Sequence, residues 1–390
     1  MRPLVFPSRI IRCSRLGVSR VLGSRSVTSG TTPLKEGALS QVRRALDKQI
    51  IGHEQGKEAL LLALVAQEHV YIEGPPGVAK TMLAETVANA TGLSFFFYQM
   101  HRDTKLHELI GDAVIVKEPQ PTGGELIRSL TRPGGILTAE LCVLDDISRA
   151  PGEALNILLR LLNERQYCGP SSGGETWDLC LRTAIATSNP SDPGSRYYTE
   201  PLDPANLDRF ALQLKVDGAI SGARWDEAAR IIDLFSSSST ADNAHPIGAA
   251  VEAEGDNEGE EEEEESCSGS GSSGATTRAA RAARAELAAA TSAHGRTTVP
   301  IRVRHLLLSF LRELTQRHGV NQRNSLLTDR TFLVKALRVM RASAVLRGRE
   351  ACAAEDLWAM RFLTCFRVPA PVHQGIDEVI ADILRREGGS

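Results

Sequence analysis

The chain has 390 residues, enough for one large domain and a smaller one, and its hydrophobic content of 42% is ordinary for a globular protein. Its formal charge of −3 argues against a nucleic-acid-binding protein, which needs a basic surface. Its longest apolar run, residues 59–66, is much shorter than the roughly 18 residues of a membrane span. Seven scattered cysteines without CxxC pairs argue against a disulfide framework and against a zinc site.

The first 29 residues contain six arginines and no acidic residue, which is the composition of an organelle transit peptide. On a helix the arginines gather on one side, opposite Ile10, Ile11, Val18, Val21 and Leu22. We therefore expect residues 1–30 to be a transit peptide that directs the protein to the mitochondrial matrix. A plastid address, or a plain basic tail on a cytoplasmic protein, remains open.

Residues 36–215 alternate helical patterns with short apolar runs, which predicts an α/β domain with a mainly parallel sheet. Strands are predicted within 69–74, 94–100, 141–146 and 182–189. Helices are predicted at 38–49, 56–67, 80–91 and 151–165.

The remaining chain is predicted to form a small all-α lid domain, interrupted by an insertion. Helical periodicity occurs within 216–235 and again within 299–385, which together form the predicted lid. Between them, residues 236–298 are rich in Ser, Gly, Ala and acids, with six consecutive glutamates at 260–265. Such a segment cannot bury enough apolar surface to fold, so we expect a disordered insertion with at most a marginal Ala/Arg-rich helix.

The strongest motif is VYIEGPPGVAKT at residues 70–81, a strand, a glycine-rich turn and a helix start. In this arrangement successive backbone N–H groups surround a phosphate chain, Lys80 reaches the β and γ phosphates, and the Thr81 hydroxyl ligates Mg²⁺. Ala79 occupies the place where the strict motif has its second glycine. The alternative, a structural glycine turn, does not explain why the strand and the helix flank it.

A second motif, LCVLDD, is an apolar strand that ends in Asp145 and Asp146. In phosphate-loop enzymes a strand next to the loop strand ends in an aspartate that holds Mg²⁺, and Asp145 fits this role. The following residue usually is a glutamate that orients the attacking water. Asp146 is one methylene shorter, so it could either work through a shifted water or make hydrolysis slow. A pair of solvated carboxylates is the alternative.

Two further residues are candidates for the same chemistry. Asn189 ends the apolar strand AIATS, where its amide could bind both the attacking water and the γ-phosphate; by itself SNP is only a turn signal. Arg209 lies near the end of the α/β domain, where an arginine can act on a phosphate of the neighbouring subunit in a ring. A surface ion pair is its alternative role.

The ordered set GPPGVAKT, VLDDISRAP, NERQ, TSNP and LDPANLDRF resembles the MoxR family of AAA+ ATPases, and the C-terminal segment LLTDRTFLVKALRVM is most similar to the RavA branch. The resemblance covers residues 40–235 and 299–367. It implies a P-loop AAA+ core with a helical lid, ATP and Mg²⁺ as cofactors, and a ring of identical subunits, which the resemblance makes a hexamer. It also implies a helix-2 insert at 108–135 and a β-hairpin at 167–182, shared with magnesium chelatase ATPase subunits.

The resemblance also implies roles by position. Arg209 matches the arginine finger, Arg330 in TDR matches sensor 2, Asn189 matches sensor 1, and Asp145 and Asp146 match Walker B. Residues 50–53 match the segment that lines the adenine pocket, with His53 where glutamine is frequent. The expected nucleotide-binding residues are Ile51, Gly52, Gly74, Pro75, Pro76, Gly77, Val78, Ala79, Lys80, Thr81 and Met82.

The sequence therefore predicts a Mg²⁺-dependent ATPase that couples hydrolysis to client remodelling or to metal or cofactor loading. Two alternatives stay open. Asp146 would suit a nucleotide-gated scaffold that hydrolyses ATP slowly or not at all, and the shared inserts would suit the motor subunit of a magnesium chelatase. The resemblance further implies a von Willebrand A domain partner on a separate chain.

Overall fold

The computed structural model describes residues 39–119, 125–168, 176–192, 194–197, 199–237, 272–327 and 329–388. The predicted transit peptide and residues 238–271 of the predicted insertion lie outside these ranges, so those predictions are untested. Within the described ranges, no helix combines the length and the hydropathy that crossing a membrane would require.

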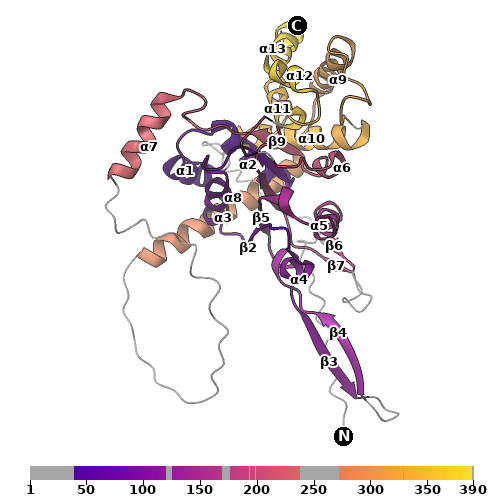
Figure 1. The fold of residues 1–390 in the computed structure, drawn as a ribbon. Coiled ribbons are helices and arrows are strands. Elements are labelled where there is room, and N and C mark those ends of the chain that lie inside the picture. The colour runs from indigo at the N-terminus through magenta and orange to yellow at the C-terminus, as the bar shows by residue number, and fades with distance from the viewer. Residues whose placement is uncertain are drawn as a thin grey trace, which may run out of the picture.

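A parallel five-stranded sheet forms the centre of the molecule, as the sequence predicted (Figure 1). Its strands, in spatial order, are β2 (Phe95–Gln99), β5 (Leu141–Asp145), β8 (Thr183–Ser188), β1 (Val70–Glu73) and β9 (Leu212–Lys215). This order corrects one expectation, because β8 pairs with both β1 and β5 and so separates them. β9 was not predicted as a strand.

Alternate residues of the strands enter two hydrophobic cores, one on each face of the sheet. In β5, for example, Leu141 and Val143 pack into one core while Cys142 and Leu144 pack into the other. Burial on both faces explains why the strands are continuous apolar runs rather than alternating ones. The first face is covered by α1 (Ser40–Gln49), α2 (Glu54–Ala66) and α3 (Lys80–Thr91), and the second by α4 (Leu106–Ile110) and α5 (Gly152–Glu164).

Two small antiparallel hairpins extend from the sheet domain. The first joins β3 (Ala113–Pro119) to β4 (Glu125–Thr131) within the predicted helix-2 insert, and Figure 1 shows it projecting away from the body of the molecule. The second joins β6 (Gln166–Tyr167) to β7 (Trp177–Asp178), which confirms the hairpin expected before β8. Short helical turns complete the domain: η1 (Gly135–Leu137), η2 (Ile147–Arg149) and α6 (Pro204–Leu207).

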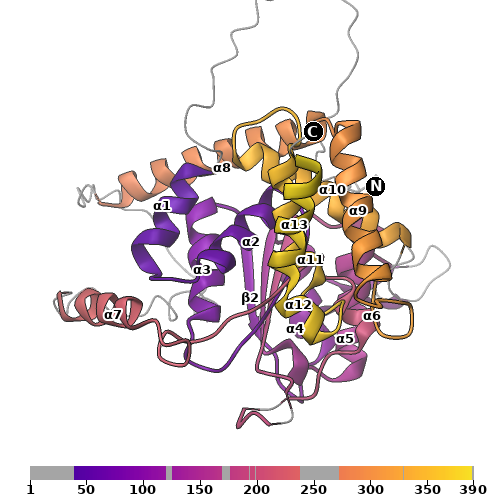
Figure 2. The same cartoon turned by 90° about the horizontal axis from the view of Figure 1, so that it is seen from above.

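The C-terminal residues form the predicted small helical domain. Its helices α10 and α11 pack on α2 and β9 of the sheet domain. The elements are α9 (Ile301–Gln316), α10 (Asp329–Leu346), η4 (Ala354–Ala359), α11 (Met360–Thr364), α12 (Ala370–Gln374) and α13 (Ile376–Gly388). The first predicted lid helix, α7 (Trp225–Ser237), lies apart from them in both ribbon views (Figures 1 and 2).

Part of the predicted disordered insertion is helical, which corrects that prediction. Helix α8 (Ser272–Arg296) packs against α2, α3 and α10, and Figure 2 shows it running along these helices. Its Ala283, Leu287 and Ala290 are buried in the core. Arg284 anchors it further, because one guanidinium nitrogen lies 2.7 Å from Glu140 Oε2 and the other donates to the Gly92 carbonyl at 3.1 Å. An otherwise polar, alanine-rich segment therefore folds by using the sheet domain's core.

Candidate active site

The turn between β1 and α3 has the backbone geometry of a phosphate-binding loop. A Cβ on Gly74 would lie 2.4 Å from the Val216 carbonyl oxygen, so only glycine fits there. Gly77 has a φ of 80°, a value that glycine adopts without strain. Ala79 also lies in the left-handed region, with a φ of 61°, at the residue before α3. The position therefore favours glycine for a conformational reason, and Ala79 adopts the same backbone at a cost of about 1 kcal/mol.

Lys80 is the first residue of α3, and its side chain lies back over the loop. Only 8% of the residue is exposed, and its Nζ donates to the carbonyl oxygens of Gly74 at 2.6 Å and Pro75 at 2.9 Å. Burial lowers the pKa of Lys80, while the carboxylates of Asp146, Asp145 and Glu73 oppose that shift. A cation held among carbonyl oxygens beside the loop can exchange these acceptors for phosphate oxygens.

The two predicted metal ligands meet, although they come from different elements. Thr81 Oγ1 donates to Asp145 Oδ1 at 3.0 Å, which links the start of α3 to the end of β5. The Thr187 hydroxyl, from β8, donates to the same oxygen. A hydroxyl beside a carboxylate is a donor set that fits Mg²⁺, which prefers oxygen ligands and is usually bound by one or two carboxylates together with phosphates.

Asp146 lies directly beside this pair, and both oxygens of its carboxylate have partners. Asn189 Nδ2 donates to Oδ1 at 3.2 Å, and Arg149 Nε lies 3.3 Å from Oδ2. Asp146 has a φ of 53°, and its backbone N–H donates to Thr187 Oγ1 at 3.2 Å. Burial raises the pKa of Asp146, and Asp145 adds to the rise, whereas Arg149 and Lys80 lower it. The carboxylate is thus held in place and made more basic.

Sequence reasoning missed Arg149 and Thr187. Arg149 follows Asp146 by three residues in the short turn η2, which brings its guanidinium back to the carboxylate. The spacing within DDISR was a usable signal for this ion pair. Thr187 is buried in β8 and looked like an ordinary strand residue, so its contact with Asp145 depends on a strand pairing that no local pattern gives.

The segment predicted to line the adenine pocket faces the start of α7. A Cβ on Gly52 would lie 2.3 Å from Glu227 Oε2, and burial lowers the pKa of His53, assisted by the nearby Arg224 cation. Val78 of the phosphate-binding loop approaches Gly218, which lies on the way from β9 to α7. These segments therefore come together beside the loop, where the base of a nucleotide would extend from its phosphates.

The structure does not bring two predicted residues to this cluster. Arg209, just after α6, donates from Nη1 to Ala205 O at 3.0 Å and to Asn206 Oδ1 at 2.9 Å, while its buried Nε has no hydrogen-bond partner. Arg330 is exposed in the first turn of α10. In the described part of the chain, neither side chain bonds to Lys80 or to the paired carboxylates. Their predicted roles remain predictions.

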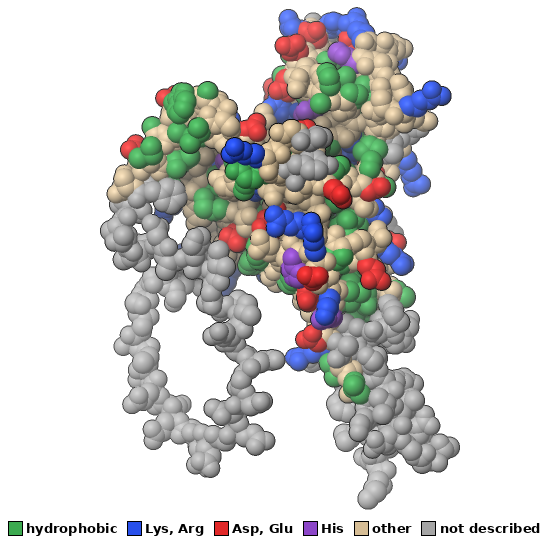
Figure 3. Space-filling model, viewed as in Figure 1, with side chains coloured by type: hydrophobic (Ala, Val, Ile, Leu, Met, Phe, Trp, Pro, Cys, Tyr) green, Lys and Arg blue, Asp and Glu red, His purple; other side chains and the backbone are tan. Residues whose placement is uncertain are grey.

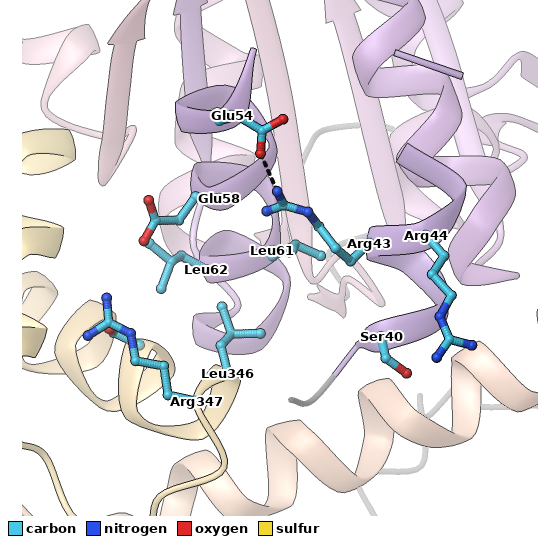
Figure 4. Close-up of a pocket in the computed structure, with 10 residues that line it drawn as sticks. Ser40, Arg43, Arg44, Glu54, Glu58, Leu61, Leu62, Leu346 and Arg347 are labelled. Carbon is cyan, nitrogen blue, oxygen red and sulfur yellow. Dashed lines mark hydrogen bonds and ion pairs between the residues drawn. The ribbon is translucent and has the colours of Figure 1, made fainter. Parts of the chain in front are cut away.

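A separate cavity lies between α1, α2 and α10 (Figure 4). Its volume is about 620 Å³, and Arg43, Glu54, Glu58 and Arg347 are among its lining residues. Figure 4 shows Arg43 directed toward Glu54, with which it forms an ion pair. None of the described residues that line it belongs to the phosphate-binding loop, so this cavity is distinct from the candidate site.

Comparisons with known proteins agree with this geometry. Residues 69–210 match the family described as AAA domain (dynein-related subfamily). The chain is similar to Chaperone MoxR1 of Mycobacterium tuberculosis, with 32% identity over 46% of this chain and 44% of that protein. It is also similar to Protein MoxR of Methylorubrum extorquens, with 27% identity over 46% of this chain and 50% of that protein.

A solved structure agrees over most of the chain. A protein from Cytophaga hutchinsonii whose structure was solved as that of a candidate ATPase superposes with a TM-score of 0.57, and the superposition covers 89% of this chain and 93% of that one. Because the identity is 16%, this likeness shows the fold alone. The α/β P-loop AAA fold with C-terminal helices is therefore confirmed. The similarity to the two MoxR proteins spans about half of their length or less, and it supports the MoxR family rather than a particular branch.

Proposed function

We propose that this chain is an AAA+ ATPase of MoxR type that binds Mg·ATP at the carboxyl edge of its sheet and hydrolyses it to ADP and phosphate. One observation carries the proposal. Thr81 bonds to Asp145 and Asn189 bonds to Asp146, so residues from α3, β5 and the end of β8 form one polar cluster behind a phosphate-binding loop. A structural turn would need none of these side chains.

Each residue has a distinct role in the proposed reaction. The backbone N–H groups of residues 77–81 hold the phosphate chain, and Lys80 leaves its carbonyl partners to bind the β and γ phosphates. Thr81 and Asp145 hold Mg²⁺, which when bound offsets negative charge on those phosphates. Asp146 and Asn189 orient a water molecule, and Asp146 accepts its proton. As the water oxygen bonds to the γ-phosphorus, the bond to the leaving ADP oxygen breaks.

The proposed reaction is completed between subunits. Arg209 makes no bond to its own chain's phosphate-binding cluster, which is the situation expected of an arginine that acts on a neighbour's γ-phosphate. We therefore propose a ring of identical subunits, a hexamer by analogy with the family, in which Arg330 reports the nucleotide state. Exposed apolar side chains on α7, including Trp225 at 65% exposure and Ile232 at 68%, offer a surface for such an assembly (Figure 3).

The cellular role is proposed in general terms only, as a type of client, a location and a type of partner. Chaperone MoxR1 supports a role in remodelling a client protein, and loading of a metal or cofactor is the other form that coupling could take. A mitochondrial matrix location is proposed from the arginine-rich, acid-free N-terminus. A von Willebrand A domain protein on a separate chain is the proposed partner, by resemblance to the family.

The proposed ATPase is tested by steady-state release of phosphate at several protein concentrations, with Lys80→Ala as the blank. We expect turnover per subunit to rise with concentration, because each site needs an arginine from a neighbour. Turnover that is measurable but independent of concentration would contradict the shared site. Turnover equal to the blank at every concentration would contradict the ATPase.

A nucleotide-gated scaffold is the second candidate, and one observation favours it. Both oxygens of Asp146 already have partners, Asn189 and Arg149, and the side chain is one methylene shorter than glutamate. If this arrangement persisted with ATP bound, Asp146 could not reach a water and hydrolysis would be slow. Replacement of Asp146 by glutamate separates the two candidates, because the longer side chain restores the reach.

A further inference from the structure

The segment on both sides of Arg209 is fixed by one buried arginine from the C-terminal helical domain. Arg367 is only 1% exposed. Its Nη1 donates to Ala211 O at 3.0 Å and its Nη2 to Phe210 O at 2.7 Å, just after Arg209. Its Nε donates to Asp208 Oδ1 at 3.2 Å, just before Arg209. A further bond to Leu363 O at 2.7 Å holds the guanidinium to its own domain.

A second cation of the helical domain reaches the same place. Lys335 of α10 donates from Nζ to Asp208 O, and its Nζ lies 3.8 Å from Asp208 Oδ1. Burial, together with the Arg367 cation, lowers the pKa of Lys335 to about 8. Asp208 therefore pairs with cations from two parts of the helical domain, which makes it the main electrostatic link between that domain and the turn.

Gln213 of β9 strengthens this link from the sheet side. Its Nε2 donates to Leu207 O at 2.8 Å, while its Oε1 accepts from the Phe366 N–H at 3.3 Å. The backbone before and after Arg209 is thus bonded to residues 366–367 either directly or through one side chain. Among the described residues, Arg209 itself bonds only within its own turn, and its buried Nε has no partner there.

The residues on both sides of Arg209 are bonded to the helical domain, whereas the Arg209 side chain is not. This difference indicates that the link does more than stabilise the fold. A fully buried guanidinium is expensive unless its donors are all bonded. Here four of its five acceptors are oxygens of Asp208, Phe210 and Ala211, in the turn that carries the proposed trans-acting arginine. Docking of the helical domain could rely on apolar contacts alone, such as those of α10 and α2, which share one hydrophobic core. The polar link instead fixes direction, because five donors in a planar fork allow little rotation of the turn.

We infer that Arg367, acting through Asp208 and the carbonyl groups of residues 210 and 211, is a positioning residue that sets the direction of Arg209 toward the neighbouring subunit's nucleotide. Lys335 supports the same turn from α10. A shift of the helical domain in one subunit then changes the position of Arg209 at the active site of the next subunit. This inference rests on the proposed function, since it assumes that Arg209 acts in trans.

The test uses full-length variants in mixed assemblies. Arg367→Met keeps the nucleotide site of its own chain and misplaces Arg209, whereas Asp145→Asn weakens its own Mg²⁺ site and keeps Arg209. The assay is run at a Mg²⁺ concentration at which Asp145→Asn alone shows no turnover. Mixing the two creates interfaces where an intact site faces a correctly placed arginine. We expect Arg367→Met alone to lose turnover by about 100-fold, as misplacement near 1 Å can cause, with little change in KM for ATP. Turnover should return in the mixture.

Two further variants test whether a loss in Arg367→Met comes from the link to the Arg209 turn, residues 207–211. Asp208→Asn is the milder change, with the same shape and no charge, and should show the same loss and rescue if Arg367→Met does not fold. Arg349→Met is the matched control. It breaks another ion pair of the helical domain, in which Nη2 of the partly exposed Arg349 lies 2.8 Å from Oδ1 of the buried Asp356. This pair does not touch residues 207–211, so the variant should keep turnover within about twofold.

Arg209→Ala in the same mixtures distinguishes a failure of the positioning role from a failure of the proposed action in trans. If Arg209→Ala is rescued by Asp145→Asn but Arg367→Met and Asp208→Asn are not, the positioning role is wrong and the proposed function stands. Full activity of folded Arg367→Met would also overturn the positioning role. If Arg209→Ala is not rescued, the action in trans is wrong, and the inference falls with it.

Discussion

The phosphate-binding cluster and the Arg209 turn, residues 207–211, are both parts of the proposed active site, but they are built differently. Lys80, Thr81, Asp145, Asp146 and Asn189 bond to one another or to their own loop within a single sheet edge. The Arg209 turn is held instead by side chains of the C-terminal helical domain. Under the proposed function, the first part is complete in one chain, whereas the second acts only when another chain is present. Binding and hydrolysis should therefore respond to different mutations.

The largest effect is expected from Lys80→Ala, which removes the cation inside the phosphate-binding loop. The loss of a buried charge that pairs with phosphate should weaken ATP binding by about 2 to 5 kcal/mol. Isothermal titration calorimetry measures this change, and Lys48→Ala, an exposed lysine at the end of α1, is the control. Unchanged affinity in Lys80→Ala would show that this loop does not bind the nucleotide.

The second prediction concerns the metal. Removal of Mg²⁺ by EDTA should abolish turnover, and Asp145→Asn should raise the Mg²⁺ concentration needed for half-maximal turnover by about tenfold or more. The reason is that Asp145 supplies the carboxylate that meets the Thr81 hydroxyl. Asp178→Asn, on the exposed β7 strand, serves as the control. An Asp145→Asn enzyme with the wild-type Mg²⁺ requirement would remove Asp145 from the metal site.

The third prediction concerns how ATP turnover depends on pH through the ionisation of Asp146. Burial raises the pKa of Asp146, and activity should fall as pH drops through that raised pKa, because the protonated carboxyl cannot accept a proton. Arg149 lowers this pKa, so Arg149→Ala should move the acid limb of the turnover profile to higher pH. Arg160→Ala, which breaks an exposed pair with Glu164, should leave the limb in place. A limb unmoved by Arg149→Ala would mean that Asp146 does not set it.

The smallest effect is expected at the loop backbone. Ala79 has a positive φ, which glycine adopts more easily than alanine. Ala79→Gly should therefore stabilise the fold by up to about 1 kcal/mol. The greater freedom of glycine in the unfolded chain offsets part of this gain. Urea denaturation of both proteins measures the difference. A clear loss of stability would mean that Ala79 is not strained.

The sequence was most informative where function depends on consecutive residues. The strand, loop and helix at 70–91 were predicted because their apolar pattern and turn residues are local. Asn189 was predicted to take part in the same chemistry as Asp146. The structure places the two side chains in contact, because polar residues at the ends of parallel strands share one edge of the sheet. The place of β8 between β5 and β1 was not, because strand order depends on pairings distant in the chain.

Two features of the helical part of the chain were not predicted, for different physical reasons. The Ala/Arg-rich segment was predicted to be at most a marginal helix, because small alanines contribute little hydrophobicity beside the arginines. In the structure its Ala283, Leu287 and Ala290, which repeat at helical spacing, are buried in the core. Arg367 gave no signal at all, because a lone arginine in a sequence is usually exposed. Its burial follows from the backbone oxygens that surround it, and these are positioned only when the helical domain meets the Arg209 turn.

The most direct test of the central claim is ATP turnover by the wild-type chain beside Asp146→Glu, with ATP binding measured on the same samples. If Asp146 is a working base, turnover exceeds the Lys80→Ala blank, rises with protein concentration and changes by less than about tenfold in the variant. Turnover at the blank level that glutamate raises a few hundred-fold, about 3 kcal/mol, would contradict the ATPase and identify a nucleotide-gated scaffold.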